Sequence, residues 1–135
     1  MKSASMLKLF SHLAWLLAAG ALIMSAAPAA VAHHGWSWAV EQQTELEGTI
    51  QEISMAPPHP TLRVTDAEGT LWQIDLGNPS QTARSGFTAE SAEPGDAITV
   101  LGNRHRDETR KHMKAVCITI GGTRYDMYPD RIRDK

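Results

Sequence analysis

Alternation of apolar and polar residues is the feature of this chain that most constrains its fold. In residues 46–51, Leu46, Gly48 and Ile50 fall on one face and polar side chains on the other, which is typical of a half-buried strand. Glycine and proline residues, which favour turns, separate this segment from others of the same kind. The predicted strands are residues 46–51, 61–65, 71–76, 97–103 and 113–120, with residues 123–127 extending the edge.

The same alternation predicts the core. Ile53 falls out of phase with Leu46 and Ile50, so we expect a β-bulge near Gln51 or Glu52. Cys117 lies between apolar neighbours in the last long strand and is expected to be buried and inert. The side chains expected in the core are Ile50, Val64, Trp72, Ile74, Ile98, Val100, Val116 and Ile118.

One short helix is predicted between the third and fourth strands, over residues 79–85. Asn78 can cap its first turn, Pro79 suits its first position, and Gly86 ends it. This order of elements is that of an OB-type barrel. We therefore predict an all-β domain, a five-stranded OB-like antiparallel barrel with one short helix between strands 3 and 4. An open antiparallel sheet or a small sandwich is the alternative.

The first 32 residues read as a signal peptide. Two lysines lie within the first eight residues, an uncharged run rich in Leu and Ala follows over residues 13–30, and Ala30 and Ala32 occupy the −3 and −1 positions of a cut before His33. The alternative is an uncleaved membrane anchor; crowding of small residues at the end of the run favours cleavage. We expect an exported protein, periplasmic or secreted, that meets the membrane only during export.

Charge and cysteine content limit the kinds of partner and the covalent cross-links that the chain can have. Removing residues 1–32 from the 135-residue chain leaves 103 residues, enough for one small domain. The leader holds two of the thirteen basic residues and no acidic one, so the remainder carries a formal charge of −4. This balance argues against a nucleic-acid partner, and a single cysteine rules out an internal disulfide. The expected segments are a signal peptide (1–32), an N-terminal arm (33–43), the OB-like domain (44–128) and a charged, frayed tail (129–135).

Several features of the chain occur together in one known family: His33-His34 just after the leader, Pro58-His59 in the loop after the first strand, Asn78-Pro79, the turn Pro94-Gly95-Asp96 and the final Val-containing strand. On these features the chain resembles the domain-of-unknown-function 6152 family over essentially all of its mature part. That family usually carries Asn-Pro-His in the loop between its first two strands, and here Pro57 replaces the Asn. The resemblance implies no established activity, so function is argued from the residues.

Histidines are the strongest candidates for chemistry. If the leader is cut before His33, the mature chain begins with His33 and His34, which place an α-amine and two imidazoles together. Nitrogen donors of this kind suit copper, nickel and zinc. His59 lies in a loop stiffened by prolines, and we expect it to be the third ligand. The alternative is a polar, frayed N-terminus with His59 in solvent.

Other candidates carry less weight. His105 and His112 are weaker metal candidates, because seven residues of separation can bring them together across a hairpin; we expect two exposed loop histidines. Trp36 and Trp38 either pin the arm to the barrel or offer a stacking surface for a ligand. A basic cluster in the same region is interpreted as a solvated hairpin loop. It contains Arg104, Arg106, Arg110, Lys111 and Lys114.

The expected function is therefore a small exported binding protein that carries or buffers a transition metal, with copper favoured, through His33, His34 and His59. The alternative is an OB-like module that holds a small molecule or partner protein through aromatic residues, without metal. The sequence contains no nucleophile elbow, P-loop, HExxH or glycine-rich dinucleotide motif. This favours a binding protein over an enzyme, and a redox enzyme built on a copper brace at the N-terminal histidine is a weaker option.

Overall fold

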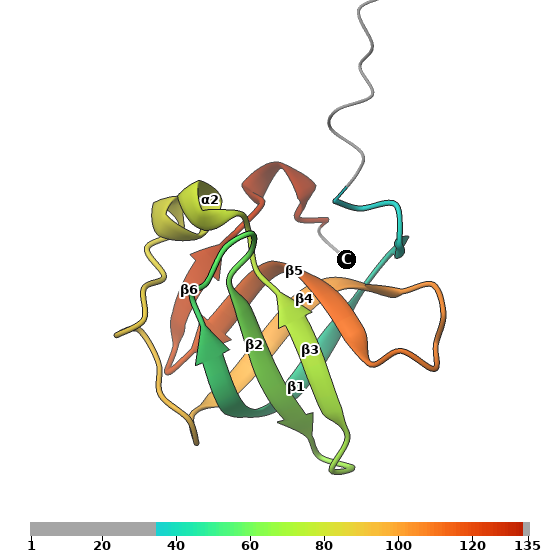
Figure 1. The fold of residues 1–135 in the computed structure, drawn as a ribbon, viewed down its shortest axis with the longest axis horizontal. Coiled ribbons are helices and arrows are strands. Elements are labelled where there is room, and N and C mark those ends of the chain that lie inside the picture. Colours follow the sequence, from blue (N-terminus) through green and yellow to red (C-terminus); the bar gives the residue numbers. More distant parts are fainter. Residues whose placement is uncertain (1–34, 134–135) are drawn as a thin grey trace, which may run out of the picture. The chain divides into compact units, whose positions relative to one another are not determined.

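The computed structural model describes residues 35–133, so the predicted signal peptide and His33 and His34 lie outside the described residues. Strands dominate, and one short helix follows the third of them (Figure 1). The elements are β1 (Ala39–Ser54), β2 (Thr61–Asp66), β3 (Leu71–Asp75), α2 (Pro79–Arg84), β4 (Ala97–His105), β5 (His112–Ile120), β6 (Thr123–Asp126) and the 3₁₀ helix η2 (Pro129–Arg131).

The strands form one sheet in the order β3-β2-β1-β4-β5-β6, and an additional pairing of β3 with β5 closes five of them into a ring. Neighbouring strands are antiparallel except for the β3–β5 pair, which is parallel. A closed ring of five strands with a helix after the third is the OB-type arrangement. The predicted OB-like barrel is thus confirmed. Its ring closes through the parallel pairing of β3 with β5, which we call the parallel seam, and β6 is added at the edge beside β5.

Strand β1 bends round the barrel and pairs with two partners. Its register with β2 slips between Ile50 and Glu52, the position predicted for a bulge. At Gly48 a β-carbon would lie 2.5 Å from the carbonyl oxygen of Thr65, so only glycine lets the two backbones approach this closely. The bulge and the close approach together give β1 the curvature that a ring of five strands requires.

The core lies inside the ring. All eight side chains predicted to be buried are buried, and Ile50, Val64 and Val100 have no exposed surface. Cys117 is buried too, at 5% exposure, and burial raises the pKa of its thiol, as expected for an inert cysteine. The core also contains side chains that were not among these eight, including Leu76 and Met127 at the ends of predicted strands and Phe87 outside them.

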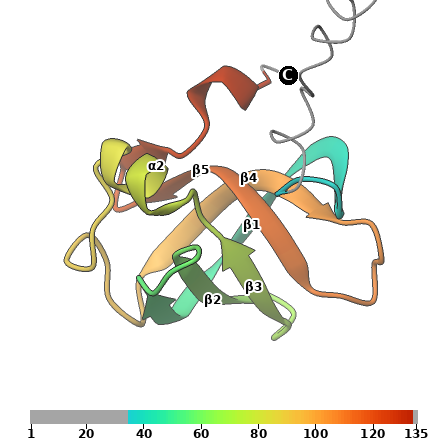
Figure 2. The same cartoon turned by 45° about the horizontal axis from the view of Figure 1, so that its top comes forward.

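The helix begins where its sequence predicts. The Asn78 side chain accepts a hydrogen bond from the Gln81 backbone, and the Gln81 side chain accepts one from the Asn78 backbone, which completes a capping box. Just beyond α2, Phe87 packs edge-on against Tyr125, with ring centroids 5.4 Å apart. Figure 2 shows α2 at one end of the ring.

Two predicted segment boundaries need correction. Residues 39–43, assigned to the arm, belong to β1, because Ala39 pairs with His105 on β4. The tail from residue 129 begins with η2, and Gln43 Nε2 donates a hydrogen bond of 2.6 Å to the carbonyl oxygen of Arg131. Partners elsewhere in the domain therefore order both segments. Within residues 35–133, no helix is long and apolar enough to cross a membrane.

Candidate functional site

His59 is the predicted metal ligand that lies within the described residues. It follows Pro58 in the loop between β1 and β2, and Pro60 anchors the loop by accepting a hydrogen bond of 2.9 Å from Leu76 N. The His59 side chain is half-buried. Its Nδ1 atom is fully buried and has no hydrogen-bond partner among residues 35–133. A buried polar atom without a partner is uncommon in a folded protein and calls for an explanation.

The surroundings of His59 favour the neutral imidazole. Burial lowers its pKa below the usual 6.5, and the nearby Lys114 ammonium lowers it further, while the Asp75 carboxylate acts in the opposite direction. Burial and the ammonium together outweigh the carboxylate. A neutral imidazole keeps a lone pair on one nitrogen, and this is the form that binds metals.

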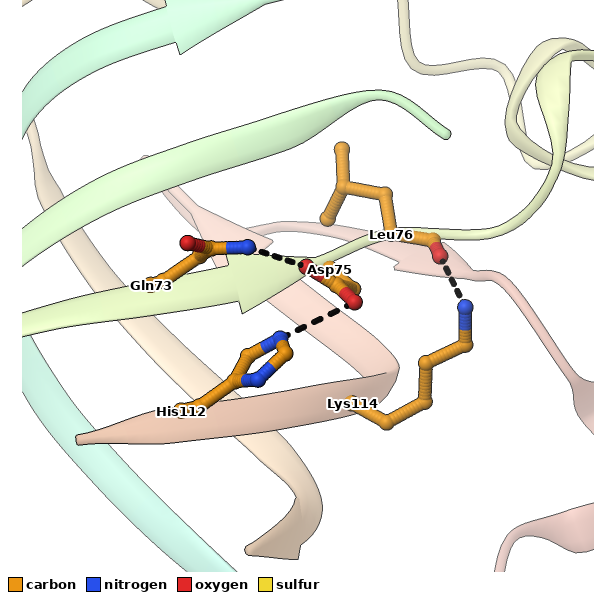
Figure 3. A network of polar contacts seen from close by, with 5 residues as sticks. All are labelled: Gln73, Asp75, Leu76, His112 and Lys114. Atoms are coloured by element: carbon orange, nitrogen blue, oxygen red, sulfur yellow. Dashed lines mark hydrogen bonds and ion pairs between the residues drawn. The ribbon is translucent and has the colours of Figure 1, made fainter. Parts of the chain in front are cut away.

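Asp75 lies at the end of β3, and its carboxylate contacts two side chains, those of His112 and Gln73 (Figure 3). His112 Nε2 is 3.0 Å from Asp75 Oδ2, and Gln73 Nε2 donates to Oδ1 at 3.1 Å. The His112 and Asp75 side chains are 17% and 14% exposed. Burial raises the pKa of Asp75, but these two contacts together with Lys114 outweigh it, and the pKa lies below its usual value. Asp75 is therefore ionised at neutral pH.

Lys114 is a buried lysine that the sequence analysis assigned to a solvated loop, and this assignment was wrong. The residue is 2% exposed, and its ammonium Nζ donates to the carbonyl oxygen of Leu76 at 2.9 Å (Figure 3). Its pKa is lowered by burial and raised in part by Asp75. The rings of Tyr128 and Trp36 lie 5.6 and 6.0 Å from Nζ. Its place inside the Val- and Ile-rich segment 113–120 is the sequence signal that could have identified it.

Both tryptophans of the predicted arm contact the domain. Trp38 stacks on His112 with ring centroids 4.2 Å apart and on His105 at 5.3 Å. Trp36 meets Tyr128 edge-on at 4.9 Å. The expectation that Trp36 and Trp38 pin the arm to the barrel agrees with these contacts.

His105 and His112 are not the exposed loop histidines that we expected. They end β4 and begin β5, they are partly buried, and their ring centroids lie 6.0 Å apart. Their separation of seven residues does bring them together across the hairpin. His105 Nδ1 accepts a hydrogen bond from Asp107 N at 2.9 Å, and His112 is held by Asp75. Both imidazoles therefore already have polar partners.

The described residues alone do not build a metal centre. Across residues 35–133, no group of three or more His, Cys, Asp or Glu side chains is placed to hold a metal ion. His33 and His34 lie outside that range, so of the three predicted ligands only His59 is placed. The chemistry at this end of the barrel is that of a neutral imidazole, His59, beside an ionised carboxylate, Asp75, and a buried ammonium, Lys114.

Comparisons with known proteins bear on family and fold. A search of curated proteins gave no match. Among solved structures, the crystal structure of the S. pombe Stn1–Ten1 complex is similar to this chain with a TM-score of 0.49 at 18% sequence identity, covering 58% of this chain and 57% of that chain. Residues 19–114 match the profile of DUF6152, a family of unknown function, and the chain belongs to that family.

Proposed function

We propose that the protein is exported and binds a transition metal, with copper best matched to its donors, as a carrier or buffer. The ligands in this proposal are His33, His34 and His59. The observation that carries it is the His59 imidazole, whose buried Nδ1 has no partner among the described residues and whose lowered pKa keeps the ring neutral. Such a group has an unused lone pair at neutral pH.

The N-terminal donors complete the set. After cleavage behind Ala32, the α-amine and imidazole of His33 can chelate a metal, and the amine titrates near neutrality, so its deprotonation costs little.

Two charges near His59 act on a bound cation in opposite directions. The Asp75 carboxylate attracts it, while the Lys114 ammonium repels it and also lowers the pKa of His59. Copper(II) experiences the same repulsion as any other dication, but its strong bonds to imidazole and amine nitrogen offset more of it. The surroundings therefore favour a nitrogen-bound transition metal over calcium or magnesium.

The alternative, a module that holds a ligand through exposed tryptophans, has less support. The Trp38 ring is stacked on His112, and the Trp36 ring packs against Tyr128. A stacking surface would have to use faces that these contacts leave open.

The first experiment determines the mature N-terminus and the bound metal together. Protein from the exported fraction is analysed by intact mass, N-terminal sequencing and elemental analysis. We expect a sequence that begins His-His-Gly, together with bound copper. A mature protein that retains residues 1–30 would contradict the proposed site, because the α-amine would then be absent from His33.

The second experiment locates the ligands. Copper(II) titrations compare the native mature protein with a form extended by one residue before His33, with His59→Ala and with His105→Ala. The extension should weaken binding most, since it removes a chelate ring; His59→Ala should weaken it less, and His105→Ala should leave it unchanged. Equal affinity for all four forms would show that the site is elsewhere. If no form binds copper, nickel or zinc, the non-metal binding module becomes the better proposal.

A further inference from the structure

A basic groove, separate from His59, is lined mainly by residues from the first part of β1 and from the hairpin that joins β4 to β5. Its cavity volume is about 380 Å³, within the range of small-ligand sites. Trp72 also lines it, and one acidic residue lies among its charged lining. The charged residues that line it are Arg104, Arg106, Glu108, Arg110 and Lys111.

Two carboxylates, Glu108 in the lining and Asp107, which interacts electrostatically with Arg110, oppose the four cations of this groove only in part. The ion pairs His112–Asp75 and Arg124–Asp126 do not include a groove residue. The acidic residue next to Glu108, Asp107, hydrogen-bonds Thr109 in its own loop. The whole chain carries a formal charge of −2, so the positive groove is a local feature and does not reflect bulk charge.

Two of the arginines are anchored in a way that leaves their outer nitrogens available. Arg104 donates from Nε to Thr44 Oγ1 at 3.1 Å, and Arg106 donates from Nε to the carbonyl oxygen of Ala39 at 3.1 Å. No hydrogen bond within residues 35–133 uses the Nη groups of either one. A guanidinium held by its inner nitrogen presents a planar pair of donors, the geometry that suits bidentate binding of an oxyanion.

Trp72 places two of the cations close together. The Arg104 guanidinium lies 4.8 Å from the centroid of a Trp72 ring, and Lys111 Nζ lies 5.6 Å from it. The indole is fixed in turn, because its Nε1 donates to Asp66 Oδ2 at 2.8 Å. Cation–π attraction offsets part of the repulsion between the like charges. The cations are therefore held near each other before any ligand arrives.

We infer that this groove binds a small anion that carries two or more phosphate groups. Several cations around one cavity favour a ligand with several negative groups, and three arginines favour the planar, bidentate contacts that phosphate oxygens accept. The groove residues do not overlap with the ligands of the proposed metal site, so the two inferences stand or fall separately. Arg104, Arg106, Arg110 and Lys111 are exposed, as expected for a solvated hairpin, and the inference assigns a ligand to this exposed cluster.

The test is titration calorimetry with sodium triphosphate on the native exported protein, in buffer free of divalent metal. We expect binding of one triphosphate per chain, weaker at high salt. Arg104→Gln and Arg106→Gln should each weaken it about tenfold, the effect of losing charge-assisted hydrogen bonds. Inorganic monophosphate should bind at least about tenfold more weakly than triphosphate, because it reaches fewer of the cations.

Matched variants make the test decisive. Arg84→Gln removes the same charge from the exposed end of α2 and should leave triphosphate affinity unchanged, as should His59→Ala. If Arg104→Gln is unstable, Arg110→Gln replaces it in the test. We expect this variant to fold, because the Arg110 side chain makes no hydrogen bond among the described residues. Absence of binding, an equal loss in Arg84→Gln, or monophosphate affinity equal to that of triphosphate would each overturn the inference.

Discussion

Asp75 and His112 link the two strands that close the barrel. Their side chains meet at 3.0 Å, Oδ2 to Nε2, across the parallel seam where Gln73 of β3 lies opposite His112 and Asp75 lies opposite Lys114 of β5. The seam is short and consists of three residue pairs. We expect this partly buried contact to stabilise the closure of the ring, and the Asp75 carboxylate also acts on His59.

The first prediction concerns Asp75→Asn. The variant should lose about 1–3 kcal/mol of unfolding free energy at pH 7, because a charged hydrogen-bond acceptor is replaced by a neutral one. The folded pKa of Asp75 lies below 3.8, so the unfolded carboxyl takes up its proton first as the pH falls. The stabilisation is thus present above pH 3.8 and is lost as the pH falls through the folded pKa. Urea unfolding at neutral and acidic pH measures it.

Asp126→Asn is the control for this prediction. Asp126 pairs with Arg124 at 2.7 Å on the surface, with side chains 40% and 51% exposed. Exposed pairs contribute little, so this variant should change stability by less than about 1 kcal/mol. If the two variants are equally destabilised, or if the effect of Asp75→Asn is independent of pH, the ion pair does not stabilise the seam.

The second prediction concerns the pKa of His59. Lys114 lowers it and Asp75 raises it, so the two neighbours should give changes of opposite sign. In an NMR pH titration of the ring proton, Lys114→Met should raise the pKa of His59 towards 6.5, and Asp75→Asn should lower it further. Shifts of the same sign in both variants would show that these charges do not act on His59. Asp75→Asn alone still decides the question if Lys114→Met does not fold.

Most of the fold could be predicted because it is encoded locally. The alternation around Leu46 and Ile50 defines a face of β1, the out-of-phase Ile53 reveals the bulge, and Asn78 with Pro79 marks the start of α2. Each of these features depends on residues within a few positions of one another. The core followed from the same pattern, since alternate residues of a strand in a closed ring point inward.

What could not be predicted depends on partners distant in sequence. Residues 39–43 lack clear alternation, yet they join β1, and the Asn103 side chain on β4 donates to the carbonyl oxygens of Val40 and Glu41 at 2.9 and 3.0 Å. Lys114 is buried and reaches Leu76 because β3 and β5 pair at the parallel seam, and no local sequence pattern predicts that pairing. At the candidate site, the loop of His59 was predictable, but the charges that act on His59 were not.

The third prediction tests the close approach of β4 and β5. A β-carbon on Gly102 would collide with the carbonyl oxygen of Lys114, a backbone atom that cannot rotate away. Gly102→Ala should therefore cost about 1–3 kcal/mol of unfolding free energy, the usual cost of overpacking. Gly35→Ala is the control, because nothing lies within 4 Å of its β-carbon position, and it should be close to neutral. Thermal unfolding of both variants compares them, and equal melting temperatures would contradict the prediction.

The fourth prediction tests the core. Val100 and Ile118 have no exposed surface and lie opposite each other on β4 and β5. Val100→Asp or Ile118→Asp should unfold the domain, because a lone buried carboxylate costs several kcal/mol, on the order of the total stability of a small domain. Leu71→Asp, at a position that is 43% exposed, should stay folded. Circular dichroism distinguishes these outcomes, and a folded Val100→Asp protein would show that the barrel interior admits water.

The last prediction separates the two kinds of nitrogen donor in the proposed copper site. Copper affinity should fall as the pH drops, because protons compete for the donors. The free α-amine has an ordinary pKa of about 7.7–8.0, whereas the pKa of His59 lies below 6.5, so between pH 8 and 6.5 the amine should account for most of the loss. His59→Ala should keep this pH dependence at lower overall affinity. Extension by one residue before His33 should reduce it, since the amine no longer chelates. Competition titrations with a copper chelator across this range measure how copper affinity changes with pH in each form. The same pH dependence in the native and extended forms would show that the α-amine is not a ligand.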